Sequence, residues 1–145
     1  MSRLKMAALA TVLAFAPLAP ALAQEAPASP APQMSPADEA FKAQGEAFEA
    51  ENQKFLAELQ AILGDAALDK ATKMSRSDAV ITAFTPQIEA FGGVLKAYLS
   101  ELANRPENAE ESAAILAASE TVTAQLLSAP ATLRDAIKRD LEAQP

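Results

Sequence analysis

The sequence contains no cysteine, no histidine and no tryptophan among its 145 residues. Without cysteine, the chain can form neither a disulfide nor a thiolate nucleophile. Without histidine, it also lacks the commonest general base and the usual imidazole ligand of zinc. We therefore expect a protein that is not an enzyme, and the sequence identifies no catalytic residue, no cofactor-binding residue and no metal ligand.

Glycine is also scarce, and none of the four glycines forms a phosphate-binding loop or flanks a serine as in a nucleophile elbow. Carboxylates are the remaining reactive groups, and those that lie close on a helix surface are Glu46 with Glu49, and Glu107 with Glu110 and Glu111. No loop has the alternating oxygen ligands of a calcium site, so a solvated acidic surface is the favoured interpretation. A hydrolase that uses two carboxylates across a sugar-sized cleft remains a third alternative.

The first 23 residues have the layout of a secretory signal peptide. Arg3 and Lys5 precede an apolar run from Met6 to Leu18, and Ala21 and Ala23 have the spacing that a signal peptidase recognises. The apolar run is shorter than the roughly 20 residues needed to cross a bilayer. We therefore predict cleavage after Ala23, export to a bacterial periplasm or to the exterior, and no stable membrane anchor in the mature protein.

The next segment, residues 24–36, places prolines among alanines and serines in the text QEAPASPAPQMSP. It has almost nothing to bury, and we predict a disordered linker in front of a helical bundle domain at residues 37–145. Loss of the leader reduces the 12 cations to 10 against 19 acidic residues, so the mature net charge is −9. This charge repels nucleic acid and anionic lipid. The expected partner is therefore an unknown protein or a second copy of the chain.

Two long amphipathic segments follow the linker. Ser35 and Pro36 are typical of a helix start, and the first helix is predicted to run to Gly64. The second helix is predicted from about Ser77 to Ala103, with an apolar face about a third of its circumference wide. Each segment carries three rings seven residues apart, namely Phe41, Phe48 and Phe55 in the first and Phe84, Phe91 and Tyr98 in the second.

The two sets of rings are predicted to face each other. A short connection favours antiparallel neighbours in a helical bundle, and antiparallel pairing gives three ring pairs: Phe55 with Phe84, Phe48 with Phe91, and Phe41 with Tyr98. One buried seam explains both sets better than a surface that displays rings to a ligand. Gly45 lies on the same face, and we hypothesise that its missing side chain makes room for a ring, so that leucine at this position would destabilise the fold.

Pro86 and the Gly92-Gly93 pair interrupt the second helix. Pro86 points away from the apolar face, so a tolerated bend is the favoured interpretation. A fresh helix start with Thr85 as N-cap is one alternative, and a hinge or cleft is another. Any groove is expected between helices near this bend. Residues 66–73 either form a short helix or extend the second helix toward the N-terminus.

The last third of the chain predicts two more helices. Asn104, Arg105 and Pro106 are predicted to end the second helix and to begin a third. The buried stripe of this third helix is predicted to contain Ile115, Ala118, Val122, Leu126 and Ala129. Pro130 is predicted to break the chain before a short helix that starts near Thr132 and buries Leu133, Ile137 and Leu141.

These patterns predict an all-α fold, a small antiparallel helical bundle of three main helices plus a short C-terminal helix. With the signal peptide, they indicate an envelope protein that acts as a binding, adaptor or chaperone-like protein. The alternative is a self-associating structural or assembly component of the envelope, because the apolar face of the third helix is thin.

Overall fold

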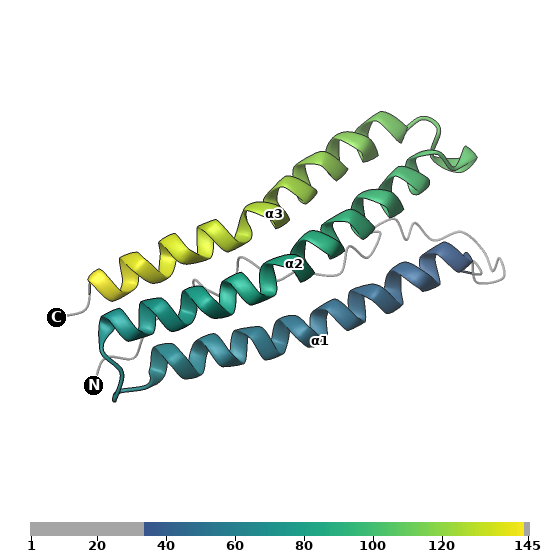
Figure 1. The fold of residues 1–145 in the computed structure, drawn as a ribbon. Coiled ribbons are helices and arrows are strands. Elements are labelled where there is room, and N and C mark those ends of the chain that lie inside the picture. The colour runs from purple at the N-terminus through teal and green to yellow at the C-terminus, as the bar shows by residue number, and fades with distance from the viewer. Residues whose placement is uncertain (1–33, 144–145) are drawn as a thin grey trace, which may run out of the picture.

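The computed structural model describes residues 34–143, and the predicted signal peptide and most of the predicted linker lie outside them. Three long helices pack against each other: α1 (Pro36–Gly64), α2 (Lys70–Ala103) and α3 (Ser112–Glu142), with a short 3-10 helix, η2 (Pro106–Asn108), between the last two. Helix α2 lies between α1 and α3, and neighbouring helices run antiparallel (Figure 1). The expected all-α fold with three main helices is confirmed.

Helix α1 begins and ends where the sequence predicts. The Ser35 side chain accepts a hydrogen bond from the Asp38 amide, and the Asp38 carboxylate accepts one from the Ser35 amide, which completes a capping box. At the other end, the Lys73 ammonium donates to the Leu63 carbonyl at 2.8 Å. A cation at this position complements the negative end of the helix dipole.

Helix α2 begins at Lys70, earlier than the expected Ser77, because the Asp69 carboxylate accepts a hydrogen bond from the Thr72 amide at 2.7 Å. From Lys70 onward, the alternative that residues 66–73 extend the second helix is therefore correct. The helix continues through Pro86, and the Thr85 hydroxyl donates to the Ile81 carbonyl at 2.8 Å inside it. The alternative of a new helix capped by Thr85 is wrong.

Helix α3 differs most from expectation. Pro106 begins η2 rather than the third helix, which starts at Ser112. The helix then passes through Pro130 to Glu142, so the predicted break and the separate short C-terminal helix are both wrong. A proline inside a helix costs about 3 kcal/mol. Burial of the apolar side chains on both sides of it, Leu126, Ala129, Leu133 and Ile137, offsets that cost.

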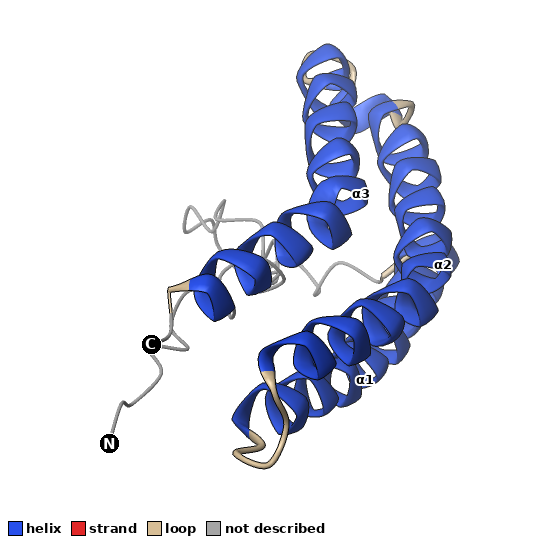
Figure 2. Ribbon diagram, turned by 60° about the vertical axis from the view of Figure 1, so that its left-hand side comes forward, coloured by secondary structure: helices blue, strands red, loops and turns tan. Residues whose placement is uncertain are grey.

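The path of α3 changes at about its midpoint. Figure 2 shows α3 bending there, and Pro130 accounts for a bend because its ring displaces the preceding turn. The buried stripe is partly as predicted, since Leu126 and Ala129 are buried while Ile115 and Val122 are half-buried. Ala118 is exposed and its neighbour Ser119 is buried instead, which corrects that part of the prediction.

One apolar core joins the three helices. Leu59 of α1, Ile81 of α2 and Ile137 of α3 are each no more than 1% exposed. The rest of this buried cluster consists of Phe55, Leu63, Phe84, Ile88, Leu95, Leu126, Ala129, Leu133 and Leu141. Because each helix contributes to the same cluster, none of the three can bury its apolar face without the others.

Candidate binding groove between α1 and α2

A ladder of stacked rings joins α1 to α2. The three predicted pairs form, with ring centroids 4.4 Å apart for Phe55 and Phe84, 4.3 Å for Phe48 and Phe91, and 4.0 Å for Phe41 and Tyr98. Diagonal contacts of 5.8 Å between Phe48 and Phe84, and of 6.2 Å between Phe41 and Phe91, make the stack continuous. The prediction of a seam is confirmed, and the ladder fixes the register of α1 on α2.

The hypothesis for Gly45 is not supported. A β-carbon at this position would have no atom within 4 Å, so no ring occupies the space that the missing side chain leaves. Gly92 is the glycine at a close approach, because a β-carbon there would lie 3.4 Å from Cδ2 of Leu127 on α3. The Gly92-Gly93 pair thus belongs in part to the packing of α2 on α3.

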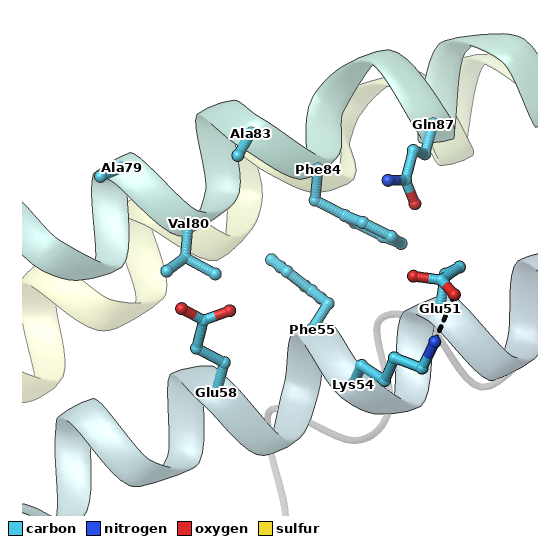
Figure 3. A pocket seen from close by; sticks show the side chains of 9 residues that line it. All are labelled: Glu51, Lys54, Phe55, Glu58, Ala79, Val80, Ala83, Phe84 and Gln87. Carbon is cyan, nitrogen blue, oxygen red and sulfur yellow. Dashed lines mark hydrogen bonds and ion pairs between the residues drawn. The ribbon is translucent and has the colours of Figure 1, made fainter.

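A groove of about 510 Å³ opens beside the seam, between the second half of α1 and the first half of α2. Its lining consists of Glu51, Lys54, Phe55, Glu58, Ala79, Val80, Ala83, Phe84 and Gln87. The rings of Phe55 and Phe84 stack on each other with each side chain only 5% exposed, while the charged side chains come from α1 (Figure 3). The groove was expected near Pro86 and the two glycines; it reaches Gln87, the neighbour of Pro86, but neither glycine lines it.

The groove lies on the side of α2 away from α3. Arg134 of α3 donates hydrogen bonds to the Asp78 carboxylate and to the Thr82 hydroxyl, which mark the flank of α2 that α3 covers. Ala83 and Gln87 lie five residues after these two, roughly 140° around the helix. No residue of α3 lines the groove, so this flank of the α1–α2 pair is left open.

The charges at the groove belong to α1. The Lys54 ammonium pairs with the Glu51 carboxylate, and both side chains are largely exposed. Within the described residues, Glu58 makes no ion pair, and its carboxylate lies beside Val80 at the opposite end of the groove (Figure 3). The groove therefore combines an apolar floor with a rim that carries two carboxylates and one ammonium.

A second polar cluster holds the start of α1 against the end of α2. Arg105 donates to both oxygens of Asp38, at 2.8 and 3.3 Å, and to the Ser35 hydroxyl at 3.2 Å. The Tyr98 hydroxyl donates to Asp38 at 2.8 Å. We call Ser35, Asp38, Tyr98 and Arg105 the latch, because it connects residues that are up to 70 positions apart.

The contacts within the latch shift the pKa values of two of its members, Asp38 and Tyr98. The guanidinium of Arg105, followed by the Tyr98 hydroxyl and Ser35, holds the pKa of Asp38 well below its usual value. Burial, followed by the hydrogen bond to Asp38, raises the pKa of Tyr98. The cluster is closed on itself, since Asp38 is already bound by three partners, and we assign it to holding the fold rather than to binding a ligand.

The acidic groups considered from the sequence do not converge. Glu46 pairs weakly with Lys42 at 3.9 Å, and Glu49 accepts a hydrogen bond from Gln53 on the exposed side of α1. Among the described residues, no group of three or more acidic side chains is arranged to hold a metal ion. None of the helices in residues 34–143 is long and apolar enough to cross a membrane.

Sequence reasoning expected a groove between helices near Pro86 but not the residues that line it, and it missed the latch. It placed Phe55, Val80 and Phe84 on apolar faces but gave no role to Glu51 or Glu58. The latch had a usable signal, because the register that pairs Phe41 with Tyr98 also brings Asp38 to the end of α2. Comparisons with family models, with curated proteins and with solved structures find no match to this chain.

Proposed function

We propose that the chain is a non-enzymatic binding protein of a bacterial envelope, acting as an adaptor or in a chaperone-like role. The observation that supports binding is the open groove of about 510 Å³ between α1 and α2, where the half-buried Val80 and the exposed Ala79 and Ala83 are not covered by α3. The support for export is the signal-peptide pattern of residues 1–23. A concave apolar surface with few convergent polar groups is the usual form of a binding site.

Photo-crosslinking in the native envelope tests this proposal. A photoreactive amino acid at Ala83, which is exposed and lines the groove, is expected to capture another protein that mass spectrometry can identify. The control is the same group at Ala124, an exposed position on α3. Recovery of self-crosslinks alone would contradict an adaptor role. Fractionation and N-terminal sequencing check export, with Gln24 as the expected first residue.

Self-association is the second candidate, and an exposed apolar pair on α3 favours it. Leu116 and Leu127 are 43% and 47% exposed, and eleven residues, or about three turns, place them on one face of the helix. If they form a dimer, sedimentation will show a concentration-dependent dimer that a double Leu116→Gln, Leu127→Gln variant loses. A monomer that suppresses aggregation of unfolded clients would instead favour the chaperone-like role.

A further inference from the structure

We propose that the groove binds an amphipathic helix of a partner protein, with two basic residues seven positions apart along one side of its apolar stripe. This inference rests on the proposed binding function and names the chemistry of the partner. Its basis is the combination of the apolar floor, the two carboxylates of the rim and the way α3 packs on the opposite flank.

The helical form of the partner follows from α3. In the C-terminal half of α3, which packs on α2, Leu133, Ile137 and Leu141 are four residues apart and all buried in the shared core. Next to this stripe, Arg134 pairs with Asp78 of α2. Helix α2 thus already accepts, on one flank, a helix whose apolar stripe is bordered by a cation. The open flank also lies between two antiparallel helices, and the apolar groups that it presents come mainly from Ala79, Val80 and Ala83.

The positions of the cations follow from α1. Glu51 and Glu58 are seven residues apart, so they lie on one side of the helix about 10.5 Å from each other along its axis. A partner helix that lies along the groove would therefore match them with two lysines or arginines at the same interval. Val80, which is half-buried, and Ala83, which is exposed, would then face the apolar residues of the partner.

Lys54 shows that the rim accepts a cation. Its ammonium already pairs with Glu51, but the two side chains are 72% and 48% exposed, and such exposed pairs contribute little stability. An incoming cation can therefore replace it at low cost. The charge of Lys54 also disfavours a third cation near the centre of the partner helix, which limits the basic residues to the two ends of the stripe.

The test uses a defined probe, a synthetic alanine-based helical peptide with leucines at helical spacing and two arginines seven positions apart. Its affinity for the full mature chain is measured by fluorescence anisotropy. The double variant Glu51→Gln, Glu58→Gln is expected to bind about tenfold more weakly, and raised salt is expected to weaken binding to the parent chain. The matched control, Glu46→Gln with Glu49→Gln, removes the same charge from α1 outside the groove and is expected to bind as the parent does.

Two further measurements distinguish binding of the peptide in the groove from its general attraction to an acidic protein. Ala83→Lys places a cation in the groove and is expected to abolish binding of the peptide. Ala124→Lys, at an exposed position on α3, is expected to leave that binding unchanged. A peptide with glutamates in place of the two arginines should bind at least about tenfold more weakly. Equal binding of both peptides, equal losses in both double variants, or no binding to the parent chain would each overturn the proposal. None of these results would remove a partner captured in the envelope, so failure of this inference is distinguishable from failure of the proposed function.

Discussion

Phe48 stands in the middle of the ring ladder, although it is only half-buried. Its ring stacks on Phe91 at 4.3 Å and reaches Phe84 at 5.8 Å, so it links the outer pair of rings to the core. Rings in such stacks contribute through both the apolar area they bury and their mutual contact. A structural role therefore explains the spacing of seven better than display to a ligand does.

The expected consequence is that Phe48→Ala lowers the free energy of unfolding by about 2 kcal/mol, less than for a fully buried ring because part of this one stays in water. Chemical denaturation followed by circular dichroism measures the change. Leu116→Ala, at a side chain that is 43% exposed, serves as the control and should change stability by less than about 0.5 kcal/mol. A Phe48→Ala protein of normal stability that no longer binds a partner would show that the ring belongs to a binding surface.

The ultraviolet absorbance of Tyr98 reports on the latch alone, because Tyr98 is the only tyrosine in the sequence and no tryptophan is present. Burial and the hydrogen bond to Asp38 raise its pKa, so the phenolate absorbance should titrate above about pH 10 in the folded protein. Since folding raises this pKa, the stability contributed by the phenol is fully present below about pH 10 and is lost as the pH rises through the folded-state pKa.

Asp38→Asn should move this titration down toward the ordinary value without reaching it, because the carboxylate acceptor and its charge are lost while the burial remains. The reference is the same titration in denaturant. A midpoint that does not respond to Asp38→Asn would mean that Tyr98 and Asp38 are not hydrogen-bonded in solution.

At the scale of elements, adjacent glycines in α2 have opposite surroundings. A β-carbon at Gly93 would meet no atom within 4 Å, whereas one at Gly92 would contact Leu126 and Leu127 of α3. Glycine in a helix interior costs up to about 1 kcal/mol relative to alanine. Substitution at Gly93 therefore measures the effect of helix propensity on stability, and substitution at Gly92 measures the effect of packing against α3.

We expect Gly93→Ala to raise the free energy of unfolding by about 0.5–1 kcal/mol, since only the flexibility of the unfolded chain changes. Gly92→Leu should lower it by at least about 1 kcal/mol, because the larger side chain has to displace Leu126 and Leu127. Thermal or chemical unfolding of both variants gives the comparison. A loss of stability in Gly93→Ala would indicate that the backbone at this position needs the freedom of glycine, as a hinge would.

The elements also show how far sequence reasoning reaches. The ring pairs of α1 and α2 could be predicted, because a spacing of seven on two neighbouring helices leaves a single antiparallel register that pairs all three rings. The start of α2 could not be placed, since Asp69 and Ser77 are both acceptable N-caps and only the Thr72 hydrogen bond selects the first. The prediction at Pro130 was wrong because local propensity predicts a helix break there. Burial of apolar side chains before and after Pro130 keeps the helix continuous.

The lining and the open side of the groove could not be predicted from the sequence for the same reason. Which flank of the α1–α2 pair stays open depends on where α3 packs, and that depends on α3 continuing through Pro130 so that Leu133, Ile137 and Leu141 reach the core. Glu51 and Glu58 resemble any other acids on an exposed helix until the position of α3 is known. Their role is a property of the assembled helices rather than of a local motif.

For the molecule as a whole, the question is whether its two ends unfold together. The core that all three helices share lies around Leu59, Ile81 and Ile137, whereas the latch lies at the other end of the molecule, where α1 begins and α2 ends. The ring ladder connects them, since Phe41, Phe48 and Phe91 pack against the same apolar cluster. A contiguous core of this kind favours a single cooperative transition.

We therefore expect the denaturation curve from tyrosine fluorescence, which reports the latch end, to coincide with that from far-ultraviolet circular dichroism, which reports all helices. Phe48→Ala removes the middle of the ladder and should separate the curves, with the Tyr98 transition moving to lower denaturant concentration. If the curves already differ in the parent chain, the first half of α1 opens as a local unit, because its rings are then held by α2 alone. If they still coincide in Phe48→Ala, the latch of Asp38, Tyr98 and Arg105 couples the two ends without the ladder.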